Sequence, residues 1–326
     1  MDQINWGIIG CGDVTEIKSG PAFQKVPHSK LTAVMRRNAA KAADYARRHG
    51  VEKWYSDAQK LIDDPDVNAI YIATPPSSHL EYAKAAISAG KPVYVEKPMA
   101  MSTAEATLMN ELAIANGVKL SIAHYRRELP LFLEIEKLLA EGAIGAIRFA
   151  ALKLLQAAKT DLIANSETSW RTNPDISGGG LFHDLAPHQL DLMLHWFGAV
   201  EQTNGFSLNQ SKANASDDLV SGTIMFKNGV LFNGIWCFNV APEDATDQCV
   251  IYGSEGRIQF SFFGNSLSLT NGGDSREISF DTVEHVQQPM INKVVAYFLG
   301  RGENPCPALD GVATMALMDS FTKKSK

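Results

Sequence analysis

Short apolar runs alternate with amphipathic stretches over residues 1–123 of the chain. Several runs are apolar at every position, as are strands buried between two layers of helices. The expected strands are residues 4–9, 31–35, 69–74, 92–95 and 118–122. The expected helices between them are residues 39–49, 56–63, 78–89 and 102–116. This alternation predicts an α/β fold with a doubly wound parallel sheet.

Residues at the ends of these helices support the assignment. Gly90 and Gly117 follow two of the helices, and a glycine there suits a left-handed C-cap. Ser102 opens the sequence Ser-Thr-Ala-Glu, which is a capping-box pattern for a helix start.

The pattern changes in residues 124–326. A helix is expected at 128–141, closed by Gly142, and two more at 288–299 and 310–322. The β-like runs between them are longer and alternate in polarity: 145–155, 219–226, 230–238, 247–252 and 256–262. The dipeptide Asn228-Gly229 predicts a hairpin, and residues 254–256 predict a second turn. We therefore predict a second domain of the α+β class with an antiparallel sheet, over residues 124–326.

Composition narrows the possible classes of protein. The chain of 326 residues is 45% hydrophobic and 20% charged, which suits about two packed domains. It has 30 Lys and Arg against 36 Asp and Glu, a net charge of −6. This balance argues against a protein that coats nucleic acid or an anionic membrane.

The spacing of the cysteines and the first residues of the chain indicate the cellular compartment in which the protein is expected. Cys11, Cys237, Cys249 and Cys306 lie far apart, which argues against a zinc ribbon or a disulfide framework and favours a reducing compartment. No apolar run reaches the ~18 residues of a membrane-spanning helix, and the start is unlike a signal peptide. We expect a cytoplasmic protein with no bound metal and no membrane partner.

The first expected strand runs into a glycine-rich turn, Gly10-Cys11-Gly12-Asp13-Val14-Thr15. This is G-x-G-x-x-G with Thr15 in place of the third glycine. Such glycines allow a tight turn and let a pyrophosphate approach the backbone at a helix N-terminus. A purely structural glycine turn is the alternative. The position after a first strand favours a dinucleotide site, with Gly10, Gly12, Asp13 and Val14 as cofactor contacts.

The end of the second strand reads Met35-Arg36-Arg37-Asn38. An NAD site usually has an Asp or Glu there for the ribose 2′-hydroxyl. Two guanidinium groups suit a 2′-phosphate instead, because Arg binds phosphate through two hydrogen bonds. We therefore predict NADP in preference to NAD, with Arg36 and Arg37 as contacts. The alternative is that either Arg stacks on the adenine or faces solvent.

Two clusters carry candidate catalytic groups. Glu96-Lys97-Pro98 follows the fourth expected strand, at an edge where ligands bind in such sheets. A Lys there can stabilise negative charge that develops on a substrate oxygen. A surface loop is the alternative, and a cis bond before Pro98 is an open question.

The second cluster begins at Trp170-Arg171 and continues through Gly178-Gly179-Gly180 to Asp184 and His188. Asp184 and His188 are four residues apart, so one helical face can present both, and His suits proton transfer near neutral pH. As alternatives, Asp184 caps a helix that starts at Pro187, and His188 is a core histidine.

Taken together, these motifs resemble those of the Gfo/Idh/MocA oxidoreductases. The resemblance also rests on Ala73-Thr74-Pro75-Pro76 with His79, on Gly90-Lys91-Pro92-Val93, and on Asp191 after the glycines. It implies an N-terminal Rossmann domain that binds NAD(P). It also implies an open, mostly antiparallel C-terminal sheet that serves as a surface for a homodimer or homotetramer. Thr15 and Pro187 depart from the family pattern, and Pro187 leaves the placement of His188 open.

The resemblance implies roles for individual residues. The catalytic residues would be Lys97, Asp184 and His188. Further cofactor contacts would be Thr74, Pro75, His79, Glu96 and Lys97. Substrate contacts would be Tyr125, Arg126, Trp170, Arg171, Asp184 and His188.

These roles suit an NADP- or NAD-dependent dehydrogenase that acts on a small hydroxylated substrate: a sugar, a polyol or a diol. A nicotinamide-dependent glycosidase and a non-catalytic nucleotide-binding regulator are the two alternatives.

Overall fold

The structure is a computed structural model that describes residues 2–158 and 170–322. The chain divides into two compact units, residues 1–126 with 283–315 and residues 127–282 with 316–326. The last third of the chain is therefore shared between the units, and helix α11 (Ala308–Thr322) contributes residues to both. The domain boundary at residue 123 remains a prediction.

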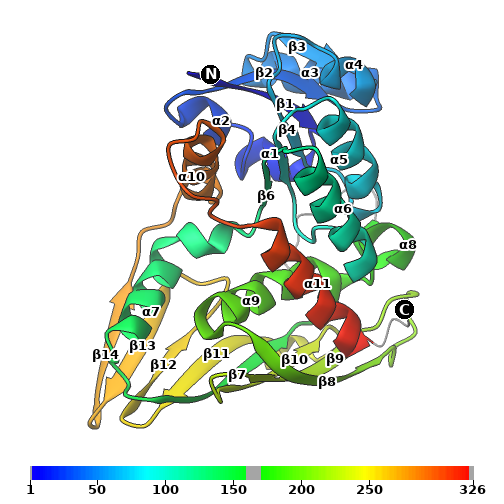
Figure 1. The fold of residues 1–326 in the computed structure, drawn as a ribbon. Coiled ribbons are helices and arrows are strands. Elements are labelled where there is room, and N and C mark those ends of the chain that lie inside the picture. Colours follow the sequence, from blue (N-terminus) through cyan, green and yellow to red (C-terminus); the bar gives the residue numbers. More distant parts are fainter. Residues whose placement is uncertain (1, 159–169, 323–326) are drawn as a thin grey trace. The chain divides into compact units, whose positions relative to one another are not determined.

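The first unit is built around a parallel sheet, which confirms the predicted fold class. Within the described residues its strands lie in the order β3-β2-β1-β4-β5-β6, and every adjacent pair is parallel (Figure 1). The strands are β1 (Ile4–Ile9), β2 (Ser29–Met35), β3 (Lys53–Tyr55), β4 (Ala69–Ile72), β5 (Val93–Val95) and β6 (Leu120–Ile122). The order reverses between β1 and β4, and ligands of doubly wound sheets bind at that point.

Helices lie between these strands: α1 (Asp13–Ile17), α2 (Ala22–Lys25), α3 (Ala39–His49), α4 (Ala58–Ile62), α5 (His79–Ser88) and α6 (Thr103–Ala115), with the short turn η1 (Pro76–Ser78). The short turn η2 (Tyr125–Glu128) and helix α10 (Gln288–Phe298) follow the last strand. The predicted left-handed C-caps are confirmed, because Gly90 and Gly117 have φ angles of +70° and +62°. The Ser102 hydroxyl accepts a hydrogen bond from the Glu105 N–H at 3.3 Å, as the capping pattern predicted.

Aromatic packing explains why α10 belongs to the first unit. The buried Trp6 ring lies 5.5 Å from the ring of Phe298 on α10 and 4.8 Å from Phe23 on α2. The Lys119 ammonium also donates to the carbonyl oxygen of Tyr297 on α10 at 2.7 Å. Burial of such rings typically stabilises a fold by a few kcal/mol per residue.

The second unit contains a mostly antiparallel sheet, also as predicted. Within the described residues the strand order is β14-β13-β12-β11-β7-β10-β9-β8, and β7–β10 is the parallel pair. The strands are β7 (Ile147–Leu155), β8 (Val200–Leu208), β9 (Leu219–Phe226), β10 (Leu231–Cys237), β11 (Thr246–Gly253), β12 (Gly256–Phe260), β13 (Ser266–Asn271) and β14 (Asp274–Ser279). The two predicted turns join β9 to β10 and β11 to β12.

One face of this sheet packs against helices. The helical segments of the unit are α7 (Pro130–Ala140), η3 (Trp170–Thr172), α8 (Pro174–Ser177), α9 (Leu181–Phe197), η4 (Pro242–Asp244) and the end of α11. Gly205, Gly222 and Gly234 pair across three adjacent strands. A Cβ at Gly222 would lie 2.3 Å from the Phe321 ring of α11, and a Cβ at Gly205 would also clash with Phe321, so these two glycines make room for that ring.

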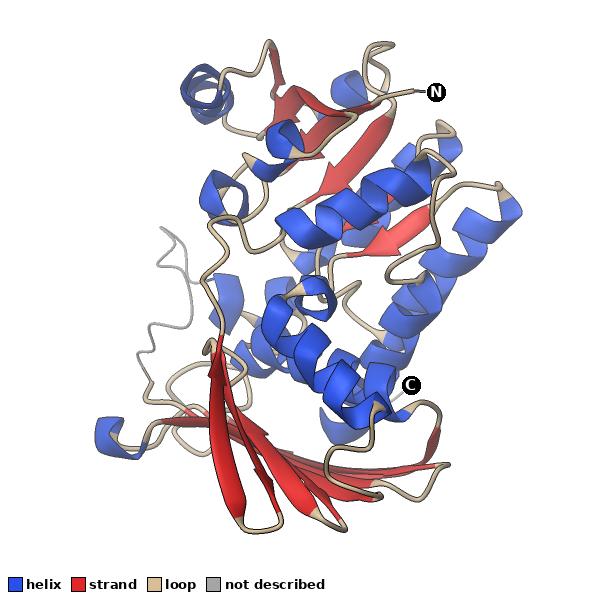
Figure 2. Cartoon of the chain, turned by 90° about the vertical axis from the view of Figure 1, so that its left-hand side faces the viewer, coloured by secondary structure: helices blue, strands red, loops and turns tan. Residues whose placement is uncertain are grey.

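The opposite face carries a row of apolar side chains. Tyr252, Phe149, Leu231 and Met225 are register partners on four adjacent strands. Phe149, Leu231 and Met225 are exposed, and the rings of Phe149 and Tyr252 stack at 4.5 Å. Figure 2 shows the strands of this sheet with one side free of helices among the described residues.

Helix α9 begins at Leu181 and runs through Pro187 to Phe197. The alternative in which Asp184 caps a helix starting at Pro187 is therefore wrong. Pro187 is buried within the helix. No described helix is long and apolar enough to cross a membrane.

Candidate functional site

Predicted site residues of the first unit follow the carboxyl ends of its strands. Gly10 comes after β1, Arg36 after β2, Thr74 after β4 and Glu96 after β5. Because parallel strands end at the same edge of a sheet, the fold brings these residues to the edge where doubly wound sheets bind ligands.

In the glycine turn after β1, position 10 must be glycine because of its backbone conformation and its contacts within the protein. Its φ angle is +96°, and a Cβ there would lie 2.8 Å from the Thr74 nitrogen. Gly12 differs, because among the described residues a Cβ there would meet only the Gly10 carbonyl oxygen, at 3.8 Å. The space beside Gly12 is therefore open to a ligand.

Helix α1 begins directly after Gly12, at Asp13 and Val14. The N–H groups in the first turn of a helix have no helical partner and attract anions. Thr15, in place of the third glycine, is buried, and its hydroxyl donates to the Gly12 carbonyl at 2.8 Å. This departure from the motif thus supports the turn.

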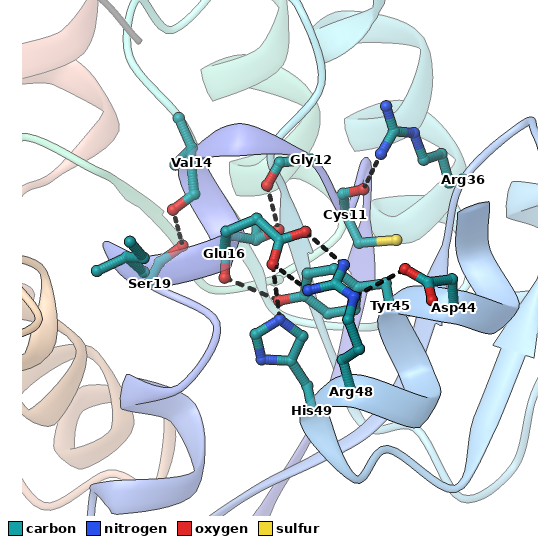
Figure 3. A network of polar contacts seen from close by, with 12 residues as sticks. Cys11, Gly12, Val14, Glu16, Ser19, Arg36, Asp44, Tyr45, Arg48 and His49 are labelled. Carbon is teal, nitrogen blue, oxygen red and sulfur yellow. Dashed lines mark hydrogen bonds and ion pairs between the residues drawn. The ribbon is translucent and has the colours of Figure 1, made fainter. Parts of the chain in front are cut away.

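Helix α3 holds α1 in place (Figure 3). The Tyr45 hydroxyl donates to the Thr15 carbonyl at 2.8 Å, and Arg48 makes two bonds to the Glu16 carboxylate at 2.7 Å each. His49 lies 2.9 Å from the same carboxylate. Hydrogen bonds from Arg48, together with His49, lower the pKa of Glu16. The acidic side chain beside the turn is thereby paired with a cation.

The end of β2 carries no carboxylate. Arg36 is half-buried and lies 3.4 Å from the Cys11 carbonyl oxygen, while Asn38 caps α3 by accepting from the Lys41 N–H. Arg37 is exposed and lines a cavity of about 310 Å³ together with Met35, Asp57, Glu81 and Tyr82. An aromatic ring and a guanidinium group thus lie beside the same space.

His79 connects two of the predicted loops. Its ring is buried, with Nε2 2.7 Å from the Thr74 carbonyl oxygen and Nδ1 3.0 Å from the Pro98 carbonyl oxygen. Burial lowers its pKa. Thr74 and Pro75 are half-buried at the start of the loop, and the Ser78 hydroxyl bonds to Thr74 Oγ1 at 2.9 Å. The ring therefore ties the loop after β4 to the loop after β5.

Glu96 and Lys97 differ in their surroundings. The Glu96 carboxylate is buried and accepts hydrogen bonds from the Tyr71 hydroxyl at 2.5 Å and from Gln287 Nε2 at 2.7 Å. Lys97 is half-buried, and the peptide bond between it and Pro98 is cis. The open question about that bond is thereby answered.

The second unit brings Arg171 and Asp184 together. Arg171 Nε donates to Asp184 Oδ2 at 3.1 Å, and its guanidinium lies 4.5 Å from the centre of the Trp170 ring. His188 lies one turn further along α9, 5% exposed, with its ring 6.3 Å from the ring of Phe263. The predicted pair Asp184 and His188 thus lies on one helix beside an arginine.

The segment near the crossover between units is largely buried. The Arg126 guanidinium lies 5.7 Å from the Tyr125 ring centre, and both residues belong to η2. Arg127 makes two bonds to Asp191, at 2.6 and 2.9 Å, with both side chains almost fully buried. Removing one partner of such a pair costs ~3–5 kcal/mol, so Asp191 contributes to the stability of the second unit.

Sequence reasoning missed Tyr71 and Gln287, which contact Glu96. The Tyr71 hydroxyl is a polar group in the otherwise apolar strand β4, and this was weak evidence that Tyr71 makes a buried polar contact. Gln287 is 191 positions from Glu96 and gave no signal in the sequence.

Comparison with protein families gives two matches. Residues 4–124 match the model of an oxidoreductase family with an NAD-binding Rossmann fold, GFO_IDH_MocA. Residues 132–259 match the model of the GFO/IDH/MocA C-terminal domain.

Several individual proteins are similar over most of the chain. An oxidoreductase of Formosa agariphila is 50% identical over 319 residues, 98% of each chain. Levoglucosan dehydrogenase of Pseudarthrobacter phenanthrenivorans is 30% identical over 294 residues, 80% of this chain and 74% of that protein. A solved structure of a levoglucosan dehydrogenase with NADH and levoglucosan has a TM-score of 0.84 at 26% identity, and covers 99% of this chain and 98% of that one.

Proposed function

The chain belongs to the Gfo/Idh/MocA family of NAD(P)-dependent oxidoreductases, and we propose that it moves a hydride between NADP(H), or NAD(H), and a hydroxyl- or carbonyl-bearing carbon of a sugar, polyol or diol. One observation carries the proposal: the glycine turn, Arg36 and Lys97 follow three strands at one edge of the first unit's sheet. The similarity to levoglucosan dehydrogenase supports a sugar-like substrate.

The glycine turn suits a dinucleotide. The open space beside Gly12 and the first-turn N–H groups of Asp13 and Val14 would receive the pyrophosphate. Thr74 and Pro75 would line the same cofactor. When bound, the nicotinamide supplies the hydride chemistry, and the protein supplies orientation and electrostatics.

We propose NADP as the preferred cofactor. Arg36 and Arg37 follow β2, where an NAD site usually has a carboxylate. The exposed Arg37 is available for a 2′-phosphate at the rim of the cavity that Tyr82 also lines. The test is the ratio of dissociation constants for NADPH and NADH. Tighter binding of NADH would contradict this proposal.

The proposed catalytic roles follow the chemistry of each group. Lys97 would donate a hydrogen bond to the reacting oxygen, and His188 would take the hydroxyl proton or return it. Asp184 would orient the substrate or His188, and Arg171 would hold Asp184 through the 3.1 Å bond. Tyr125, Arg126, Trp170 and Arg171 remain proposed substrate contacts. His79 and Glu96 would support cofactor binding through the loops they hold.

Substitution of the proposed proton-handling residues tests these roles. Lys97→Met and His188→Ala should each lower turnover by at least ~100-fold, because general acid–base catalysis typically contributes ~10²–10⁴-fold. Cofactor dissociation constants, measured by fluorescence titration, should stay within a few-fold of the wild type. Lys84→Met, on helix α5, is the control. Near-normal turnover in both variants would contradict the assignment.

A substrate screen tests the reaction type. Aldoses, polyols and diols are incubated with NADP and with NAD, and reduced cofactor is followed by its absorbance. Accumulation of reduced cofactor in proportion to product supports a dehydrogenase. Product without net reduced cofactor would indicate a glycosidase, and the absence of any turnover would favour a regulator.

We also propose that the chain forms a homodimer or homotetramer in the cytoplasm. The apolar row of Tyr252, Phe149, Leu231 and Met225 supports self-association through the second unit's sheet, because exposed apolar patches mark interfaces. The cysteines are buried free thiols, which suits a reducing compartment.

A further inference from the structure

A buried polar cluster lies directly before Lys97. The Glu96 carboxylate is 5% exposed, and one of its oxygens, Oε1, accepts from both the Tyr71 hydroxyl and Gln287 Nε2. Its other oxygen, Oε2, lies 3.2 Å from the backbone nitrogen of Lys97 and accepts from that N–H. The orientation of the carboxylate therefore bears directly on the backbone of Lys97.

Tyr71 and Gln287 determine that orientation. Both side chains are almost fully buried, and burial, together with the charge of Glu96, raises the pKa of the Tyr71 phenol. The phenol therefore stays protonated and donates. A buried carboxylate needs such donors, because loss of one leaves an acceptor without compensation for its lost water.

Gln287 also connects this cluster to the glycine-turn helix. Its backbone N–H donates to the Lys18 carbonyl at 3.2 Å, and the neighbouring His285 ring lies 2.7 Å from the Ile17 carbonyl oxygen. Ile17 is the last residue of α1, which begins at the glycine turn. The segment 285–287 thus bonds to both the end of α1 and the residue before Lys97.

We propose that Gln287 is a positioning residue for Lys97, acting through Glu96 and assisted by Tyr71. This inference rests on the catalytic role proposed above for Lys97. Glu96, Tyr71 and Gln287 fix the backbone on one side of Lys97, and the bond from His79 to the Pro98 carbonyl fixes the other side. Small displacements of a catalytic group cost much of its effect, up to ~100-fold for about 1 Å.

The test compares two neighbouring glutamines. Gln287→Met keeps the side-chain volume and removes the donor to Glu96, whereas Gln288→Met makes the same change at the half-buried first residue of α10. Gln287→Met should lower kcat by roughly 10–100-fold, while the Michaelis constant and the cofactor dissociation constant change little. Gln288→Met should match the wild type. Tyr71→Phe removes only the hydroxyl and should lower kcat in the same direction.

Two further measurements separate positioning from other roles. In protein labelled with ¹⁵N-lysine, the Lys97 amide signal should move in Gln287→Met and stay in place in Gln288→Met. In a Lys97→Met background, Gln287→Met should cause no further loss of turnover, because coupled residues are not additive.

Each outcome bears on one claim. An unmoved Lys97 amide in both Gln287→Met and Tyr71→Phe would overturn the positioning role, as would equal losses in both backgrounds. Full turnover in Lys97→Met, with the amide signal moved in Gln287→Met, would contradict the catalytic role of Lys97 and leave the positioning contact supported.

Discussion

Gly10 and Gly12 are both glycines of the same motif, but glycine is needed at the two positions for different reasons. Position 10 needs glycine because its φ is +96° and because a Cβ there would clash with Thr74 in the loop after β4. Gly12 has an extended backbone with φ of −144°, and among the described residues only the Gly10 carbonyl oxygen would lie within 4 Å of a Cβ there. The first glycine therefore serves the fold, and the second leaves room for the proposed pyrophosphate.

Alanine at each position should separate these two effects. Gly10→Ala should lower the free energy of unfolding by about 2 kcal/mol or more, since positive φ costs ~1–2 kcal/mol and the new Cβ clashes with Thr74. Gly12→Ala should keep the melting temperature but raise cofactor dissociation constants at least ~10-fold, because each lost 1.4 kcal/mol of binding is tenfold. Thermal unfolding measures the stability of both variants, and cofactor titration measures their dissociation constants. A Gly12→Ala variant with wild-type affinity would contradict the proposed pyrophosphate site.

At the scale of elements, α1 depends on its contacts with α3. A helix of five residues is too short to be stable alone. Tyr45 and Arg48 of α3 bond to Thr15 and Glu16, and this holds the helix that follows the glycine turn. Formation of the proposed cofactor site is thus tied to an ion pair between two helices.

That ion pair should make stability depend on pH. The folded-state pKa of Glu16 is below its ordinary value, so its stabilising contribution is present above about pH 4.5 and is lost as pH falls through the folded pKa. Glu16→Gln should lower the melting temperature at neutral pH, and the difference from the wild type should shrink as the pH falls below about 4.5. Glu141→Gln, at an exposed position, is the control. A difference that persists at acid pH would assign the effect to packing instead.

Two of the strands that the sequence patterns missed are weakly apolar. Strand β14 is exposed or half-buried at every position, and the short edge strand β3 has no buried residue. Such strands are held by pairing to a neighbour rather than by their own hydrophobic pattern. The predicted strands β4 and β5, by contrast, are buried at all positions, so their apolar runs were visible in the sequence.

At the scale of the whole molecule, the proposed assembly depends on the apolar row of the second unit's sheet. Phe149→Glu places a charge in the middle of this row, between Tyr252 and Leu231. The mass measured by light scattering should fall to the 35.5 kDa of a single chain, because an unpaired charge is costly inside an interface. Ile114→Glu changes a 70% exposed residue on α6 and should leave the mass unchanged. An unchanged mass for Phe149→Glu would contradict self-association through this face.

The sequence by itself determined the α/β class of the first unit, the antiparallel character of the second and the motifs at the strand ends. These features depend on local periodicity and turn chemistry, which neighbouring residues encode. Only the tertiary structure showed that residues 283–315 pack with the first unit, that Gln287 bonds to Glu96, and that Arg127 pairs with Asp191. The Gln287–Glu96 bond, for example, joins residues 191 positions apart. Such contacts depend on which buried polar groups can satisfy one another once the chain has folded, and no local pattern carries that information.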